Sequence, residues 1–596
     1  MAKSAVKKTE TLPTWDLSAL YKGLKDPAIA RDIAKLKKDA AAFAQDYQGK
    51  VAKLPADTLA KAVSDYENLQ DGFGKLGSYA QLVYAADMSD SAITKFYQDT
   101  HEALNAITGG LVFFTLEINR IPNAAYKKAL KASKKLAHYK PWIDAVRVYK
   151  DYQLSDELEQ YIHELSVVDA SWQRLYDESI TRLRFTIDDV TMTEPEALDL
   201  MSHTDPKKRK AAAKEVARVF AENGALYGLI TNTLAKAHQI EDDKRGFKKP
   251  ISSRNVSNQV EDKVVDALIS TVKKNYKDLS HNYYAWKAKQ FGKKSIDYWD
   301  RNAPLPKAED RSVPWPEAVA LVKDAYKAFS PDLAVVGDKF FEENWIDVPT
   351  RPGKSPGAFA HPTVPSAHPY LLLNYQGKTR DVMTLAHELG HGVHQVLSNK
   401  QGALMSDTPL TLAETASVFG EMLTFQEILR REKDEKCKQN LIASKVEDML
   451  NTVVRQVAFC EFERQVHDER KKGELSTQRI GEIWMGVQKD SLGPAVTLHP
   501  EYNVFWMYIP HFIHSPFYVY AYAFGDCLVN SLYGVYQKEA KAGRGAAFAR
   551  KYHAMLEAGG TLRHKELLKP FGLDASKPDF WQAGLDVIAG YIKQLK

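Results

Sequence analysis

The sequence predicts a mainly helical protein with one small β-sheet, and two observations support this fold class. Apolar residues recur at three- and four-residue spacing over most of the 596 residues, and Ala, Lys, Glu and Leu, which are good helix formers, dominate these stretches. The helical pattern then breaks in two places, a Pro- and Gly-rich stretch at 344–381 and an aromatic stretch at 500–526. Both breaks flank a histidine-rich segment, so we expect them to build a site.

The elements follow in chain order. Helical periodicity covers 26–47, 55–87, 205–240 and 440–473, for example. We place an N-terminal helical lobe at 1–200 and a larger lobe at 201–596, joined near MTEPEALDLMSHTDPKKR.

The stretch YLLLNYQGK, 370–378, predicts a short apolar strand that ends in a turn. We expect it to be an edge strand that can pair with another extended backbone, the alternative being an ordinary buried strand. The preceding GKSPGAFA, 353–360, is expected to form a flexible cover over it.

Composition excludes several classes of protein. The net charge of +5 is small for this length, the lysines are spread along the chain, and no nucleic-acid recognition module is visible. Cys437, Cys460 and Cys527 are far apart in sequence, which argues against a disulfide framework or a thiolate zinc site. No apolar run has signal-peptide or membrane-spanning length. We expect a cytoplasmic protein without a nucleic-acid, membrane or obligate protein partner.

The segment TLAHELGHGVHQ, 384–395, contains the motif HExxH within a plausible amphipathic helix. His387 and His391 are four residues apart, one helical turn, so their imidazoles can converge on one cation. Zinc suits imidazole ligands, and Glu388 is placed to act as the general base toward a water. We therefore predict a catalytic zinc site with His387 and His391 as ligands.

His394 cannot be the third ligand. It lies two turns from His387, about 10.5 Å along a helix, too far to share a metal bound at about 2.1 Å. The better candidate is Glu414, on a following helix with Pro409 at its first position. Glu421 lies seven residues further on the same face and is expected to orient a histidine. The alternative is that both are surface glutamates; Asp381 is a weaker orienting candidate.

TLAHELGHGVH followed by LAETASVFGEML resembles the thimet-oligopeptidase-like zinc metallopeptidases, in particular the oligoendopeptidase F group. LPTWDLSALY, GKSPGAFA and YIPHFIHSPFYVYAYAFG extend the resemblance over most of the chain. The resemblance implies a two-lobed helical ellipsoid with a deep central channel, one Zn²⁺ per chain, and short unstructured peptides as substrates. It also implies His387, His391 and Glu414 as ligands and Glu388 as the base.

The resemblance further implies that a histidine and tyrosines of a late loop contact the peptide. By position these are His511 and one or more of Tyr518, Tyr520 and Tyr522. We take His511 and Tyr520 as catalytic and Tyr518 and Tyr522 as substrate-binding, although sequence alone does not decide which tyrosine reaches the oxyanion. On a helix, Tyr518 and Tyr522 would share a face and Tyr520 would oppose them. Aromatic packing is the alternative for each tyrosine, and His514 is expected only to pack.

The predicted function is zinc-dependent endopeptidase activity on short peptides, in which Glu388 deprotonates a zinc-activated water. One alternative is an exopeptidase of the dipeptidyl carboxypeptidase type. It needs a cation that holds the C-terminus of the substrate, and the sequence does not place one. The other is a non-catalytic peptide-binding metalloprotein or a structural metal site, which normally has four protein ligands.

Overall fold

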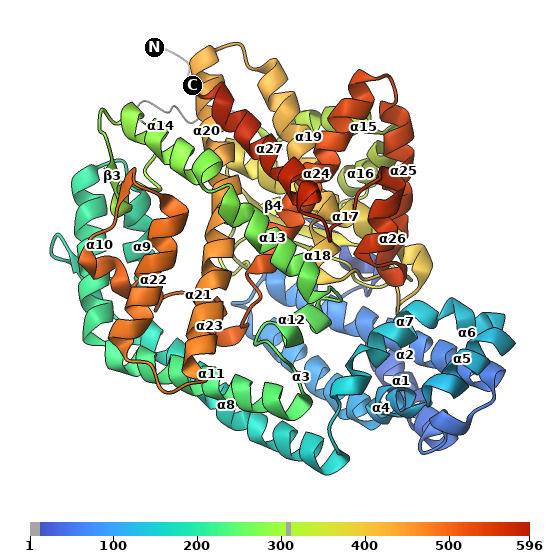
Figure 1. The fold of residues 1–596 in the computed structure, drawn as a ribbon. Helices are drawn as coiled ribbons and strands as arrows, with labels where there is room; N and C mark the ends of the chain where they lie inside the picture. Colours follow the sequence, from blue (N-terminus) through green and yellow to red (C-terminus); the bar gives the residue numbers. More distant parts are fainter. Residues whose placement is uncertain (1–11, 306–311) are drawn as a thin grey trace. The chain divides into compact units, whose positions relative to one another are not determined.

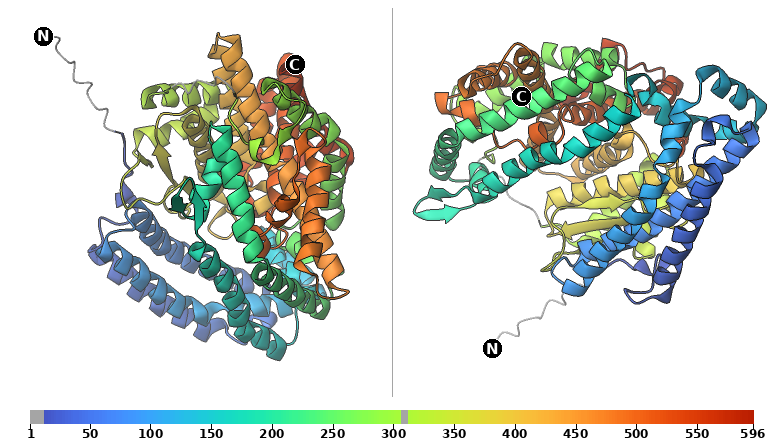
Figure 2. Two further views of the ribbon diagram at one scale, coloured as in Figure 1. Left: turned by 90° about the vertical axis from the view of Figure 1, so that its left-hand side faces the viewer. Right: turned by 90° about the horizontal axis from the view of Figure 1, so that it is seen from below.

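The computed structural model describes residues 12–305 and 312–596, and helices dominate it (Figures 1 and 2). The predicted fold class, mainly α with a small sheet beside the histidine helix, is confirmed. Part of the N-terminal segment considered for a signal peptide, 1–11, lies outside the described residues. Among the described residues, no helix is both long and apolar enough to span a bilayer.

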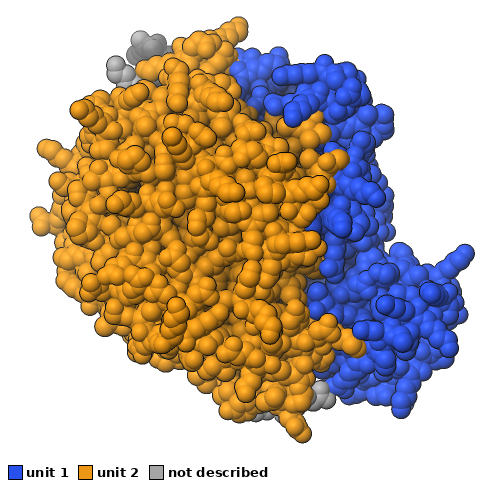
Figure 3. Space-filling view, in the orientation of Figure 1, with its two compact units in different colours: residues 1–148, 310–431, 536–571 blue, residues 149–309, 432–535, 572–596 orange. Residues whose placement is uncertain are grey.

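The chain forms two compact units, which Figure 3 draws in separate colours. Unit 1 comprises 1–148, 310–431 and 536–571, and unit 2 comprises 149–309, 432–535 and 572–596. Each unit is thus assembled from three separate stretches of sequence. The division near residue 200 that we drew from the sequence is a different partition and stays a prediction.

Unit 1 consists of fourteen described helices and a three-stranded sheet. Its helices are α1 (Pro27–Tyr47), α2 (Ala56–Ala86), α3 (Ser91–Thr108), α4 (Phe113–Arg120), α5 (Asn123–Ala132), α6 (Lys134–His138), α7 (Lys140–Val146), α15 (Trp315–Phe329), α16 (Pro331–Glu342), α17 (Thr379–Ser398), α18 (Leu410–Ala413), α19 (Thr415–Arg431), α25 (Gly545–Glu557) and α26 (His564–Leu568).

Unit 2 is helical apart from two pairs of short strands. Its helices are α8 (Asp156–Arg182), α9 (Glu194–Asp199), α10 (Pro206–Glu222), α11 (Gly224–Arg245), α12 (Ser252–Ser257), α13 (Asp262–Lys274), α14 (Asn282–Gln290), α20 (Glu435–Thr452), α21 (Val454–Arg470), α22 (Thr477–Leu492), α23 (His511–His514), most of α24 (Tyr520–Lys541) and α27 (Pro578–Gln594). Strands β1 (Phe185–Ile187) and β2 (Val190–Met192) are antiparallel, and β3 (Ile296–Asp297) and β7 (Val496–Thr497) are parallel.

The sheet of unit 1 has the order β4 (Ile346–Pro349), β6 (Tyr370–Tyr375), β5 (Phe359–His361). The strand β6 pairs parallel with β4 and antiparallel with β5. Our expectation that 370–378 forms an edge strand is therefore wrong, because β6 is paired on both sides. The edge strands are β4 and β5, and β5 is formed by the end of the segment that we expected to be only a cover.

The segment before β5 is anchored by a buried lysine. Lys354 Nζ donates to Asp347 Oδ1 at 2.7 Å, and to the carbonyls of Pro349 at 2.9 Å and Leu373 at 2.6 Å. Burial lowers the pKa of Lys354, and Asp347 opposes that shift. The carbonyl of Asp347 is a fourth oxygen partner at 3.1 Å, and these contacts of a buried ammonium hold its loop firmly to β4 and β6.

A tight turn carries the chain from β6 into α17. The Asp381 carboxylate accepts hydrogen bonds from the backbone N–H groups of Gln376 at 2.8 Å and Lys378 at 3.0 Å. It therefore caps the start of α17, and this is the role the structure shows for a residue we considered as a histidine partner. The sheet lies beside α17 (yellow in Figure 2).

Helices α17 and α19 approach each other closely at two glycines. A Cβ on Gly390 of α17 would lie 2.5 Å from the carbonyl oxygen of Ala416 and 2.6 Å from Cα of Ser417. A Cβ on Gly420 of α19 would lie 2.9 Å from the carbonyl oxygen of Ala386 and 2.1 Å from the hydroxyl of Tyr326. Gly390 costs helix propensity, but only glycine permits this backbone contact.

We predict that Gly390→Ala destabilises the protein by about 1–3 kcal/mol, because the added methyl group must push α19 away. The matched control is Gly486→Ala in the middle of α22, where the residue is exposed and a Cβ meets nothing within 4 Å. There the change should stabilise by about 0.5–1 kcal/mol. Urea unfolding measures both free energies, and equal effects would contradict the packing argument.

Candidate metal centre

Three side chains of unit 1 bring their ligand atoms together. His387 and His391 lie on α17, and Glu414 follows α18 at the break before α19. His387 Nε2 and His391 Nε2 are 3.2 Å apart, and Glu414 Oε2 lies 3.4 Å from the first and 3.5 Å from the second. Among the described residues, this is the only group of three or more His, Cys, Asp or Glu residues close enough to hold a metal ion.

These distances fit a tetrahedral zinc ion. With bond lengths of about 2.1 Å, two ligand atoms of a tetrahedral site lie about 3.4 Å apart. The three measured separations are within a few tenths of an ångström of that value. Two imidazoles and one carboxylate are also a donor set that zinc accepts, so the residues present fit the metal that the sequence predicts.

The break at Glu414 differs from the continuous helix that we expected from Pro409 onward. Pro409 precedes the single turn of α18, and Glu414 closes that turn with φ −79° and ψ 1° before α19 begins. The Ser417 hydroxyl, in the first turn of α19, donates to Glu414 Oε2 at 2.6 Å. This contact fixes the orientation of the Glu414 carboxylate, and no sequence pattern had indicated Ser417.

Glu421 contacts the ring nitrogen of His387 that does not face the other ligand atoms. Its Oε1 lies 2.6 Å from His387 Nδ1, within hydrogen-bond distance. A proton on Nδ1 leaves the lone pair of Nε2 directed at the metal position. The two glutamates expected on one face of a helix thus occupy different places around the same imidazole.

The protonation equilibria reflect three carboxylates in a buried site. Burial lowers the pKa of His387, but the hydrogen bond and charge of Glu421, together with Glu414 and Glu388, outweigh it and raise this pKa to about 9. Burial lowers the pKa of His391 to about 4. The carboxylates therefore attract positive charge to the centre of the group, which is the charge that a metal ion brings.

Glu388 is 7% exposed and stands apart from the three ligand atoms. Burial raises its pKa to about 7, and Glu414 and Glu421 act in the same direction. Its carboxylate accepts a hydrogen bond from the backbone N–H of Ala360 in β5, which opposes the shift. Glu388 thereby connects the histidine helix to the edge strand of the sheet, a contact that the sequence did not indicate.

His394 is buried on the same helix and lies outside the group of ligand atoms, as the turn geometry predicted. Burial lowers its pKa to about 4, and the charge of His391 acts in the same direction. A neutral, packed imidazole is the role the structure supports for His394.

The histidine and tyrosines of the late loop lie in unit 2. His511 Nε2 is 3.3 Å from the hydroxyl of Tyr522, and the His511, Tyr518 and Tyr522 rings contact one another. Tyr520 is fully buried and its hydroxyl accepts a hydrogen bond from Asn258 Nδ2 at 2.8 Å. Tyr518 and Tyr522 thus lie beside His511, whereas the side chain of Tyr520 lies in the core.

A buried glutamate supports this loop. Glu463 of α21 accepts a hydrogen bond from the backbone N–H of Phe517 at 2.7 Å, and Phe517 has a positive φ of 59°. Burial raises the pKa of Glu463 to about 8. His514 was expected only to pack; its ring contacts that of Tyr176, and its Nε2 also lies 2.8 Å from Asp177 Oδ1. No local sequence signal marked Glu463, because its partner is 54 residues away.

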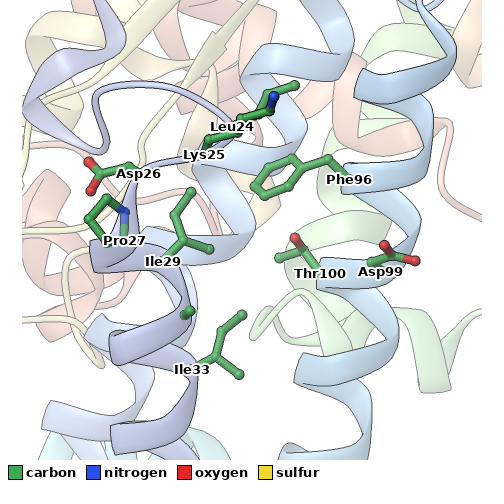
Figure 4. Close-up of a pocket in the computed structure, with 10 residues that line it drawn as sticks. Leu24, Lys25, Asp26, Pro27, Ile29, Ile33, Phe96, Asp99 and Thr100 are labelled. Carbon is green, nitrogen blue, oxygen red and sulfur yellow. The ribbon is translucent and has the colours of Figure 1, made fainter.

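A pocket of about 360 Å³ lies between the start of α1 and α3 (Figure 4). Ile29, Ile33 and Phe96 give it an apolar lining. Its two carboxylates are already engaged, since Asp26 caps α1 and Asp99 pairs with Lys95 at 2.7 Å. Its other polar lining residues are Lys25 and Thr100, and none of these four polar side chains belongs to the metal-ligand group.

The chain is similar to known oligopeptidases along its whole length. It is 25% identical to the oligoendopeptidase F homolog of Lactococcus lactis, covering 100% of this chain and 98% of that protein, and 25% identical to oligopeptidase PepF of Bacillus subtilis, covering 89% and 80%.

Solved structures share the fold. A putative peptidase from Chlamydophila abortus has a TM-score of 0.85 at 22% identity, covering 98% of this chain and 97% of that one. Oligoendopeptidase-F from Enterococcus faecium has a TM-score of 0.70 at 18% identity, covering 95% and 98%.

Two family descriptions match the chain. Residues 117–185 match Oligopeptidase F, and residues 199–587 match Peptidase family M3. The resemblance drawn from the motifs is therefore confirmed, and because the second match spans well over half of the 596 residues, the chain belongs to Peptidase family M3.

Proposed function

We propose that this chain is a zinc-dependent endopeptidase that hydrolyses short, unstructured peptides. The observation that carries the proposal is the near-tetrahedral spacing of His387, His391 and Glu414 beside a buried carboxylate, Glu388, that is not a ligand. Three protein ligands leave a fourth position open, as catalytic rather than structural zinc sites do. The family and the oligopeptidase names of the relatives support the substrate class.

Zinc, when bound, would act as a Lewis acid toward the scissile carbonyl and toward a water. Glu388 would accept the proton of the attacking water and deliver it to the leaving amine. Its burial and its raised pKa of about 7 suit a group that must both take and release a proton near neutral pH. Glu421 would hold His387 in the required tautomer through the 2.6 Å contact to Nδ1.

The edge strand β5 would bind the peptide backbone. Within 12–305 and 312–596, β5 pairs only with β6, so its outer edge is open to another strand. Ala360 connects β5 to Glu388, which would bring a paired peptide to the base. In unit 2, we assign peptide contacts to His511, Tyr518 and Tyr522. We now propose Tyr522 in place of Tyr520 for the catalytic role, because Tyr520 is buried and Tyr522 lies beside His511.

The central test is Glu388→Gln. We expect this variant to keep one zinc per chain and to lose at least about 10³-fold in kcat, because the proton acceptor is removed while the ligands remain. Metal analysis and a quenched-fluorescent peptide assay, before and after chelation, measure both quantities. Substantial residual turnover, or cleavage that survives removal of the metal, would count against the proposal.

We predict that Glu421→Gln weakens zinc binding about 10–100-fold, because His387 loses the carboxylate that orients it. Competition with a coloured chelator measures the affinity. Glu427→Gln is the matched control on α19, since Glu427 pairs with Arg430 and Arg431 and lies outside the metal group. Equal losses in the two variants would refute a specific role for Glu421.

Product mapping distinguishes an endopeptidase from an exopeptidase. A ten-residue peptide blocked at both ends should be cut at internal bonds, because backbone pairing along β5 requires no free terminus. Mass spectrometry identifies the fragments. Cleavage only after the C-terminal block is removed, and only two residues from that end, would instead support the dipeptidyl carboxypeptidase alternative.

A further inference from the structure

Two arginines of unit 2 have no carboxylate partner among the described residues. Arg455 is the second residue of α21 and donates from Nη2 to the hydroxyl of Tyr508 at 3.2 Å. Arg301 is 8% exposed, and its guanidinium bonds to the side chains of Tyr502 and Asn302, the latter at 3.4 Å. The Nε of Arg455 is buried without a hydrogen-bond acceptor. Both positive charges are therefore left without an anion.

The neighbouring cations Lys287 and Arg209 each form an ion pair with a carboxylate. Lys287 pairs with Glu447 at 2.8 Å, and Arg209 pairs with Asp300 at 2.7 Å. Lys287 also donates to the carbonyl of Arg301 at 2.6 Å, which places its ion pair next to the second arginine. The nearby carboxylates are thus committed to other partners, and the region carries an excess of positive charge.

Arg301 and Arg455 act on the same tyrosines. Burial raises the pKa of Tyr502, and the charges of both arginines oppose that shift. Both also oppose the rise in the pKa of Tyr284 that burial causes. A neutral tyrosine can accept a hydrogen bond from a guanidinium but cannot neutralise it. Burying an unpaired charge costs several kcal/mol, which a bound anion would offset.

The arginine pair lies beside the group that we assigned to peptide contacts. Burial lowers the pKa of His511, and the charge of Arg455 lowers it further. Tyr508, which accepts from Arg455, is three residues before His511 in the same loop. Arg455, Tyr508 and His511 all remain partly exposed, so a ligand can reach them.

We propose that Arg455 binds a carboxylate of the peptide substrate, and that the charge of Arg301, which acts on the same tyrosines, adds to the attraction. This inference rests on the proposed function and specifies its substrates as peptides that carry a carboxylate for this site. A guanidinium presents two parallel N–H donors that match a carboxylate. The carboxylate could be the C-terminus of a short peptide or an acidic side chain, and the experiment distinguishes them.

A structural role is the competing explanation. Arg455 also stacks over Phe459, with Cζ 5.0 Å from the ring centroid, and could simply hold the Tyr508 loop in place. Removal of Arg455 would then slow cleavage of every peptide by the same factor. A carboxylate site instead changes the ratio between peptides with and without the anion, so this ratio is the decisive quantity.

The test compares three quenched-fluorescent nonapeptides: a free acid, its C-terminal amide, and the amide with Glu as the last residue. Wild type should prefer the free acid over the amide by about tenfold or more in kcat/KM, mainly through KM, as expected for a charge-assisted hydrogen bond. Arg455→Gln should remove the preference and still cleave the amide. Arg455→Lys should retain part of it. A faster third peptide would show that a side-chain carboxylate also serves.

Arg464→Gln is the matched control, because Arg464 lies on the same helix but pairs with Asp266 at 2.7 Å. It should leave the acid-to-amide ratio unchanged. Binding of the same peptides to Glu388→Gln, measured by fluorescence anisotropy, should show the same preference without turnover. If wild type cleaves none of the peptides, the proposed function fails, and this binding measurement still decides the carboxylate site.

Two results would overturn the carboxylate site while leaving the peptidase intact. One is equal cleavage and equal binding of the acid, the amide and the Glu peptide by proteins that carry Arg455. The other is an Arg455→Gln variant that loses activity on all three by one factor, with the acid-to-amide ratio of wild type preserved.

Discussion

The backbone contact between α17 and α19 is the constraint on which the rest of the site depends. Gly390 admits the backbone of Ala416 and Ser417, and Gly420 admits the carbonyl of Ala386. Without this approach, two histidines on one helix would have no third ligand, because the carboxylates belong to another segment. The close contact also places Glu421 behind His387. Gly390 lowers the helix propensity of α17, but it permits the close approach of α19 that brings Glu414 to the two histidines.

Three neighbouring carboxylates give the candidate site a negative charge that favours a cation. Glu388, Glu414 and Glu421 are gathered in a poorly solvated site, where mutual repulsion is weakly screened. Their combined effect on His387, whose pKa rises to about 9, shows how strongly this site favours a cation. The same field keeps Glu388 basic enough to hold a proton near neutral pH. The ligand set and the base are therefore products of one arrangement of charge.

The two units contribute different chemistry. Unit 1 holds the candidate metal-ligand group and an edge strand whose preceding loop is anchored by Lys354. Unit 2 holds a loop in which Glu463 supports Phe517 and His511 contacts Tyr522. Its unpaired arginines supply the kind of cation that the sequence did not place. Binding of a peptide and cleavage of a peptide can thus be examined by separate substitutions.

The sequence by itself determined the helical class, the family, and which residues of one helix lie close enough to share a metal ion. His387 and His391 are one turn apart, and two turns exclude His394, so local geometry sufficed for them. Even Glu414 could be named, because a short connection limits where its helix can fold. Only the tertiary structure decided relations between distant segments: β5 rather than β6 at an edge, Tyr520 in the core, and Arg301 and Arg455 acting on the same tyrosine. Strand order, burial and charge pairing depend on neighbours that the chain brings together from far apart, and periodicity carries no information about them.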